Sequence, residues 1–66
     1  MKIVIHYNGR EYEIADDNDA TAEEAKNAIY EAINELEKME FQLKDGGFLL
    51  LGKEAMRRAA ILVLES

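Results

Sequence analysis

The sequence predicts a small α+β domain: a single sheet with one amphipathic helix packed on one face. Three observations lead to this class. Apolar and polar residues alternate near both ends of the chain, which indicates strands. Between them, residues 22–38 repeat apolar positions at helical spacing. The chain has only 66 residues, so residues 1–66 are expected to form a single domain. The expected order is strand, strand, helix, strand, strand, short helix, strand.

Residues 1–15 are typical of a β-hairpin. Asn8 and Gly9 stand between two alternating runs and are the preferred pair for a two-residue type I′ turn. A two-residue turn fixes the strand register, so Ile5 is expected to face Tyr12. The apolar side chains of both strands then meet on one face of the hairpin.

The helix is expected to begin after Thr21, because Thr21 and Glu24 have the spacing of a capping box. Its apolar positions recur three and four residues apart, which places them on one side. That side consists of Ala22, Ala25, Ile29, Ala32, Ile33 and Leu36. The helix should therefore bury one stripe and expose the other.

The last third of the chain returns to strands. Residues 40–44 alternate, residues 45–47 (Asp-Gly-Gly) predict a hairpin turn, and residues 48–51 form an unbroken apolar run. Residues 53–58 are expected to form a short helical turn, and residues 59–65 the closing strand. A bulge at the glycine turn would reverse the alternation, so either Leu49 and Leu51 or Phe48 and Leu50 face the helix.

The last two strands are apolar on both faces, whereas one helix covers only one face of a sheet. Each large aliphatic side chain left in water forgoes roughly 1.5 to 3 kcal/mol of burial free energy. Soluble monomers seldom expose so large an apolar patch. We therefore expect a homodimer or higher homo-oligomer that covers the face opposite the helix. The expected interface consists of Val4, Leu49, Leu51, Leu62 and Leu64.

Two other coverings stay open at this point. A different protein could occupy the same face. Residues 53–58 could also fold back over the sheet with Ala55 and Met56 and close the core within one chain. In that case, any remaining apolar patch would be the site for a partner.

Composition and charge exclude several classes. Fourteen acidic against eight basic residues give a net charge of −6, which argues against direct binding of nucleic acid. The chain has no cysteine and one histidine, His6, so neither a disulfide nor a zinc site is expected. No apolar run is long enough to span a membrane. We expect a cytoplasmic protein without a membrane partner.

Known chemical motifs match poorly, so neither an enzyme nor a cofactor is expected. Gly47, Gly52 and Lys53 have P-loop spacing, but the next residue is Glu54, which would repel phosphate. The acidic residues 16–19 lack the glycine and glutamate positions of a calcium-binding EF-hand loop. No serine, threonine or cysteine is paired with a base for nucleophilic catalysis.

Two charged surfaces are candidates for contacts. Glu24, Glu31 and Glu35 on the helix are expected to meet a basic surface of a target protein. Lys53, Arg57 and Arg58 form the one basic spot and are the possible anion contact. They define the alternative function, a small-molecule or nucleotide-binding module with a pocket between subunits.

Two resemblances bear on function. The opening hairpin and residues 20–24 resemble the ubiquitin-like β-grasp sulfur carriers, but the chain ends Leu64-Glu65-Ser66 instead of Gly-Gly, so their activity is not implied. Residues 41–51 with the following helix and strand are similar to the tails of small phage and prophage accessory proteins. That resemblance implies a protein that acts by binding, for example an inhibitor of a bacterial defence system. An idealised designed domain is also compatible with these patterns. The leading hypothesis is a non-enzymatic homo-oligomeric interaction module that inhibits or scaffolds another protein.

Overall fold

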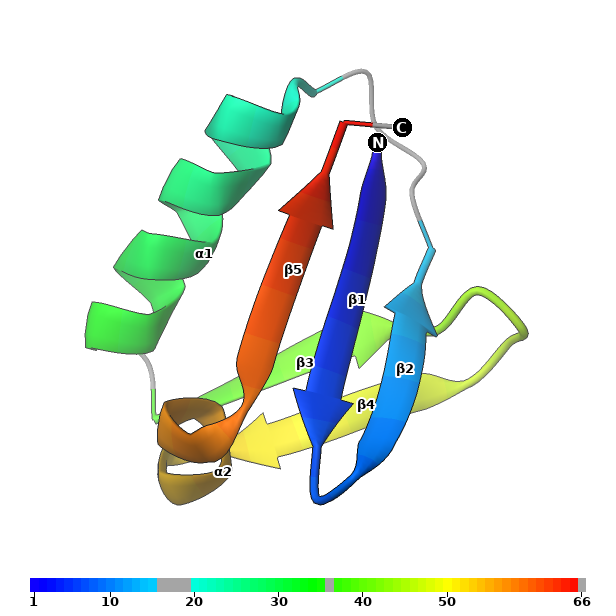
Figure 1. Ribbon diagram of the computed structural model, residues 1–66. Helices are drawn as coiled ribbons and strands as arrows, with labels where there is room; N and C mark the ends of the chain where they lie inside the picture. The colour runs from blue at the N-terminus through cyan, green and yellow to red at the C-terminus, as the bar shows by residue number, and fades with distance from the viewer. Residues whose placement is uncertain (16–19, 36, 66) are drawn as a thin grey trace.

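The computed structural model describes residues 1–15, 20–35 and 37–65, and within them the chain forms five strands and two helices (Figure 1). The elements are β1 (Lys2–Tyr7), β2 (Arg10–Ile14), α1 (Ala22–Glu35), β3 (Lys38–Gln42), β4 (Phe48–Gly52), α2 (Lys53–Arg58) and β5 (Ala60–Leu64). The predicted α+β class and the predicted order of elements are confirmed. The helix was expected to reach residue 38, but Lys38 already belongs to β3 and α1 is described only to Glu35.

The strands are divided over two antiparallel sheets, whereas the sequence predicted a single one. One sheet has the order β2-β1-β5 and the other consists of β3 and β4. The two meet at a corner, where an isolated bridge joins Ile14 to Leu43. At this corner the backbone N–H of Ala15 donates to the carbonyl oxygen of Gln42 at 2.8 Å. The small sheet is therefore joined to the end of β2, and it packs over one face of the larger sheet.

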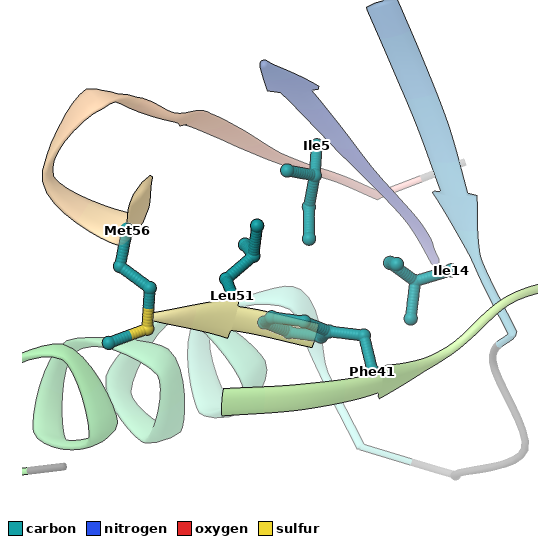
Figure 2. Close-up of a cluster of buried hydrophobic side chains, with 5 residues drawn as sticks. All are labelled: Ile5, Ile14, Phe41, Leu51 and Met56. Carbon is teal, nitrogen blue, oxygen red and sulfur yellow. The ribbon is translucent and has the colours of Figure 1, made fainter. Parts of the chain in front are cut away.

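The core lies between the two sheets, not between a sheet and the long helix. Ile5, Ile14, Phe41, Leu51 and Met56 form the buried cluster and come from β1, β2, β3, β4 and α2 respectively (Figure 2). Among the described residues of α1, none is fully buried. The apolar run of β4 and the short helix α2 therefore cover the core face of the larger sheet, a role that was expected mainly of α1.

The long helix lies beside β5 and covers the flank of the larger sheet (Figure 1). The predicted inward stripe is confirmed as far as it is described, since Ala22, Ala25, Ile29, Ala32 and Ile33 are all half-buried. Leu36 lies outside the described residues. The predicted capping box is also confirmed. The N–H of Thr21 donates to Glu24 Oε1 at 3.0 Å, and the N–H of Glu24 donates to Thr21 Oγ1 at 3.2 Å.

The first hairpin has the predicted register and turn. Ile5 pairs with Tyr12, as the two-residue turn requires. Both turn residues have positive φ, 51° at Asn8 and 78° at Gly9, which is the type I′ conformation that favours this pair. The side chains of Ile5 and Tyr12 consequently lie on the core face of the sheet.

The second hairpin turns through residues 43–47, and this loop decides which leucines are inside. Its register pairs Phe41 with Leu49 and Met39 with Leu51. Because Phe41 and Leu51 are in the core, Leu49 lies on the same inner face. The residues between them, Phe48 and Leu50, occupy the outer face.

The short helix α2 folds back over one end of the core. Met56 is buried in the cluster and Ala55 is half-buried beside it. This is the fold-back that the sequence left open as one covering for the apolar strands. It closes the core internally, yet Phe48, Leu50, Leu62 and Leu64 stay exposed.

Candidate interaction surfaces

The structure separates the five residues of the expected oligomer interface. Val4, Leu62 and Leu64 share the open face of the three-stranded sheet, whereas Leu49 and Leu51 lie on the inner face of β4. Leu51 is a core residue and cannot form part of an outer surface without unfolding. The expectation that Leu49 and Leu51 face outward is therefore wrong. The five-residue loop sets the register of β4, and this register places both leucines on the inner face.

The first apolar surface is the open face of the three-stranded sheet, which is turned toward the viewer in Figure 1. Leu62 lies directly across from Val4 on β1, and Leu64 lies across from Lys2. Leu62 and Leu64 are each 42% exposed. Val4 is buried between its two cross-strand neighbours, Leu62 and Glu13. A short apolar strip therefore runs along β5 and β1.

The β2 side of the same face is polar. His6 faces Glu11 across the strands, and His6 Nε2 lies 3.4 Å from Glu11 Oε1. Lys44 Nζ lies 2.9 Å from Glu13 Oε2. The hydrogen bond from Lys44 lowers the pKa of the Glu13 carboxyl and raises that of the Lys44 amine. The backbone N–H of Lys44 also donates to the carbonyl oxygen of Glu13 at 3.0 Å. These contacts fasten the loop of the second hairpin to β2.

The second apolar surface is the outer face of β4. Phe48 is 63% exposed and Leu50 is 68% exposed. Their cross-strand neighbours on β3, Gln42 and Glu40, are polar and exposed as well. Sequence reasoning named Phe48 and Leu50 only as an alternative, because an unbroken apolar run carries no alternation that would show which side is inside.

A shallow hollow of about 420 Å³ adjoins this surface. It lies at the end of the β3–β4 hairpin nearest to α2, and its lining includes both exposed and core side chains of β4. The lining residues are Lys38, Met39, Glu40, Leu50, Leu51 and Gly52. None of the three expected anion contacts, Lys53, Arg57 and Arg58, lines it.

One backbone edge of β4 is unpaired. The N–H of Leu43 donates to the carbonyl oxygen of Gly47 at 3.0 Å. Because hydrogen-bonded and non-hydrogen-bonded pairs alternate along an antiparallel ladder, the backbone groups of Phe48 and Leu50 point away from β3. Within the described part of the chain, β3 is the only strand that pairs with β4. The most exposed apolar side chains therefore lie on residues whose backbone groups are also free.

The three expected acidic contacts differ in their surroundings. Glu31 and Glu35 are exposed on α1, on the side away from β5. Glu24 is engaged in the helix cap. The hydrogen bond from the Thr21 N–H lowers the pKa of the Glu24 carboxyl. Glu31 and Glu35 are thus the carboxylates available to a partner, while Glu24 serves the helix.

The basic residues of α2, Lys53, Arg57 and Arg58, are all exposed. No ion pair joins them to another described residue. Gly47 directly precedes β4 and Gly52 is its last residue, so the P-loop spacing spans a strand and not a phosphate-binding loop. The glycine spacing therefore carries no nucleotide site.

The acidic residues 16–19, whose spacing does not match an EF-hand loop, lie outside the described residues. Elsewhere in the chain, over the residues that the structure describes, no three His, Asp or Glu side chains gather in a way that could hold a metal ion. Neither described helix is long and apolar enough to cross a membrane.

Both apolar surfaces consist of exposed aliphatic and aromatic side chains. Function must therefore be inferred from these surfaces and from the charges around them. Comparison of the chain with protein-family models, with curated proteins and with solved structures finds no match.

Proposed function

We propose that the protein acts by binding other proteins and not by catalysis, as a homo-oligomeric interaction module. The observation that carries the proposal is the presence of two apolar surfaces on different sheets of one small domain. Phe48 and Leu50 form one surface, and Leu62 and Leu64 belong to the other. Contiguous exposed apolar residues of this kind mark sites of protein contact.

Two separate surfaces allow two different contacts, one with a second copy and one with a target protein. Closed symmetric pairing is the commonest way for a small chain to cover an apolar surface. A target on the remaining surface would be inhibited or scaffolded by this protein. We propose inhibition, for example of a bacterial defence protein, because this is the action that the resemblance of the C-terminal third to phage and prophage accessory proteins implies.

The acidic side of α1 supports a basic target. Glu31 and Glu35 are exposed and have no ion-pair partner among the described residues. The net charge of −6 would attract a basic surface over a distance of about a Debye length, roughly 8 Å at physiological salt. We also propose that the protein works in the cytoplasm, where a chain without cysteine loses nothing in a reducing environment.

The small-molecule alternative would place an anion between subunits at Lys53, Arg57 and Arg58. The hollow of about 420 Å³ excludes all three of these residues. A protein-binding role therefore accounts for more of the surface than an anion pocket does.

Absolute mass in solution tests the self-association directly. Light scattering on a sizing column, over a wide range of concentration, should give a mass that rises toward a multiple of the 7.5 kDa chain. A constant mass of 7.5 kDa at every concentration would contradict the homo-oligomer. The apolar surfaces would then both belong to target proteins.

A further inference from the structure

The outer edge of β4 lacks the features that keep edge strands apart. Natural sheets protect exposed edges with charged side chains, proline or bulges. β4 reads Phe-Leu-Leu-Leu-Gly and carries no charge, whereas β2 contains Arg10, Glu11 and Glu13. An edge that is apolar, uncharged and unpaired is a template for another strand.

We propose that β4 pairs antiparallel with β4 of a second copy, so that two small sheets join into one of four strands. This inference rests on the proposed self-association and assigns it to one surface. The pairing is isologous: a two-fold axis passes between the Leu49 residues of the two copies, and Phe48 of each faces Leu50 of the other.

The backbone of β4 is complementary to itself in this register. Phe48 and Leu50 each present one N–H and one carbonyl oxygen to the free edge, as the alternation of the β3–β4 ladder requires. Pairing Phe48 with Leu50 of the partner copy lets each residue exchange both hydrogen bonds. Every free backbone group of these two residues is then satisfied.

The side chains agree with the backbone. Phe48 and Leu50 lie on the same outer face, so the register sets an aromatic ring beside an aliphatic side chain at two symmetric positions. Aromatic–aliphatic pairs directly across strands are among the stabilising contacts of antiparallel sheets. The contact would cover Leu50 and Phe48, the two most exposed large hydrophobic side chains among the described residues.

The charges around β4 also favour a second copy as the occupant. The same register brings the Lys53 end of each β4 toward the Asp45 turn of the other copy, with opposite charges at both ends of the contact. Gly46 and Gly47 leave that turn without bulky side chains.

The alternative occupant is an extended segment of a different protein added to the same edge. That segment would not need the symmetric match of Phe48 with Leu50 or of Lys53 with Asp45. A doubled mass of the isolated protein distinguishes the two occupants, because only the second copy is present in a purified sample.

The test compares two double variants of matched chemistry. Phe48→Lys/Leu50→Lys would place like charges directly across the proposed contact. Leu62→Lys/Leu64→Lys adds the same two positive charges to the open face of the other sheet. All four side chains are exposed, so both variants should fold, which circular dichroism would verify. If Phe48→Lys/Leu50→Lys unfolds, the milder variant Phe48→Ala/Leu50→Ala takes its place.

Sedimentation equilibrium should give twice the 7.5 kDa chain mass for the natural sequence and for Leu62→Lys/Leu64→Lys, and the single-chain mass for Phe48→Lys/Leu50→Lys. Association that survives in Phe48→Lys/Leu50→Lys, or is lost in Leu62→Lys/Leu64→Lys, would overturn the assignment to β4 while self-association stands. A natural chain that stays at 7.5 kDa would overturn the proposed homo-oligomer as well.

Discussion

β1 and β2 turn through Asn8 and Gly9 alone, whereas β3 and β4 turn through the five residues 43–47. The first hairpin sits in a three-stranded sheet and has charged residues along its outer strand. The second forms a sheet of its own and ends in an outer strand without charge. Similar pairs of strands thus differ in how their free edges are protected.

Under the proposed pairing, this difference separates the residues that stabilise the fold from those that mediate association. β2 is held at its far end by the Glu13–Lys44 contact and by the bridge from Ile14 to Leu43, the residue after β3. Its charges discourage the addition of another strand. β4 supplies Leu51 to the core through its inner face, while its outer face and its edge stay available. One strand therefore serves both the core and the proposed contact.

The largest expected effect separates the inner and outer faces of the second hairpin. Phe41→Ala removes a buried ring and should lower the free energy of unfolding by about 3 to 5 kcal/mol. Phe48→Ala removes an exposed ring and should change it by no more than about 0.5 kcal/mol in the monomer. Urea unfolding at low protein concentration would measure both.

Similar losses for the two phenylalanine variants would contradict this division. Such a result would mean that Phe48 packs against its own chain and that the outer face of β4 is not free. The low concentration matters, because an associated sample would add the dimer contact to the stability of Phe48.

A smaller effect concerns the charges that protect the first hairpin. The Lys44 hydrogen bond lowers the pKa of Glu13 below its ordinary value of 4.5. The resulting stabilisation is present above that value and is lost as the pH falls through the lower pKa of the folded state. Both groups are solvent-exposed, so the effect should be small and should weaken with salt.

Thermal unfolding of the natural chain and of Glu13→Gln should therefore converge as the pH is lowered from neutral to below the ordinary carboxyl value of 4.5 and through the lower pKa of the folded state. Lys44→Gln should lose the same part of the pH dependence, and Lys38→Gln, which alters an exposed lysine of β3, should retain it. An undiminished gap between Glu13→Gln and the natural chain at low pH would show that the contact does not depend on the ionised carboxylate.

The first hairpin and the helix start were predictable because local residues determine them. Asn8 and Gly9 specify a turn with positive φ at both positions, and that turn sets every pair of β1 and β2. Thr21 and Glu24 form their cap within one turn of helix. Neither feature depends on distant parts of the chain.

The division into two sheets and the inner face of β4 were not predictable in the same way. The corner depends on contacts between residues far apart in sequence, such as Ile14 and Leu43. The register of β4 depends on a five-residue loop, and a shift by one residue would exchange Leu51 with Leu50. Alternation along β1 and β5 places Val4, Leu62 and Leu64 on one face of the larger sheet, whereas Leu49 and Leu51 lie on the inner face of the other sheet.

Amide hydrogen exchange measured by NMR at increasing protein concentration tests the β4 pairing most directly. The N–H groups of Phe48 and Leu50 should exchange more slowly as dimer forms, because the partner strand accepts their hydrogen bonds. The N–H of Glu11, which points to the free edge of β2 by the same alternation, should keep its rate. Rates for Phe48 and Leu50 that do not change while the mass doubles would contradict strand pairing through β4.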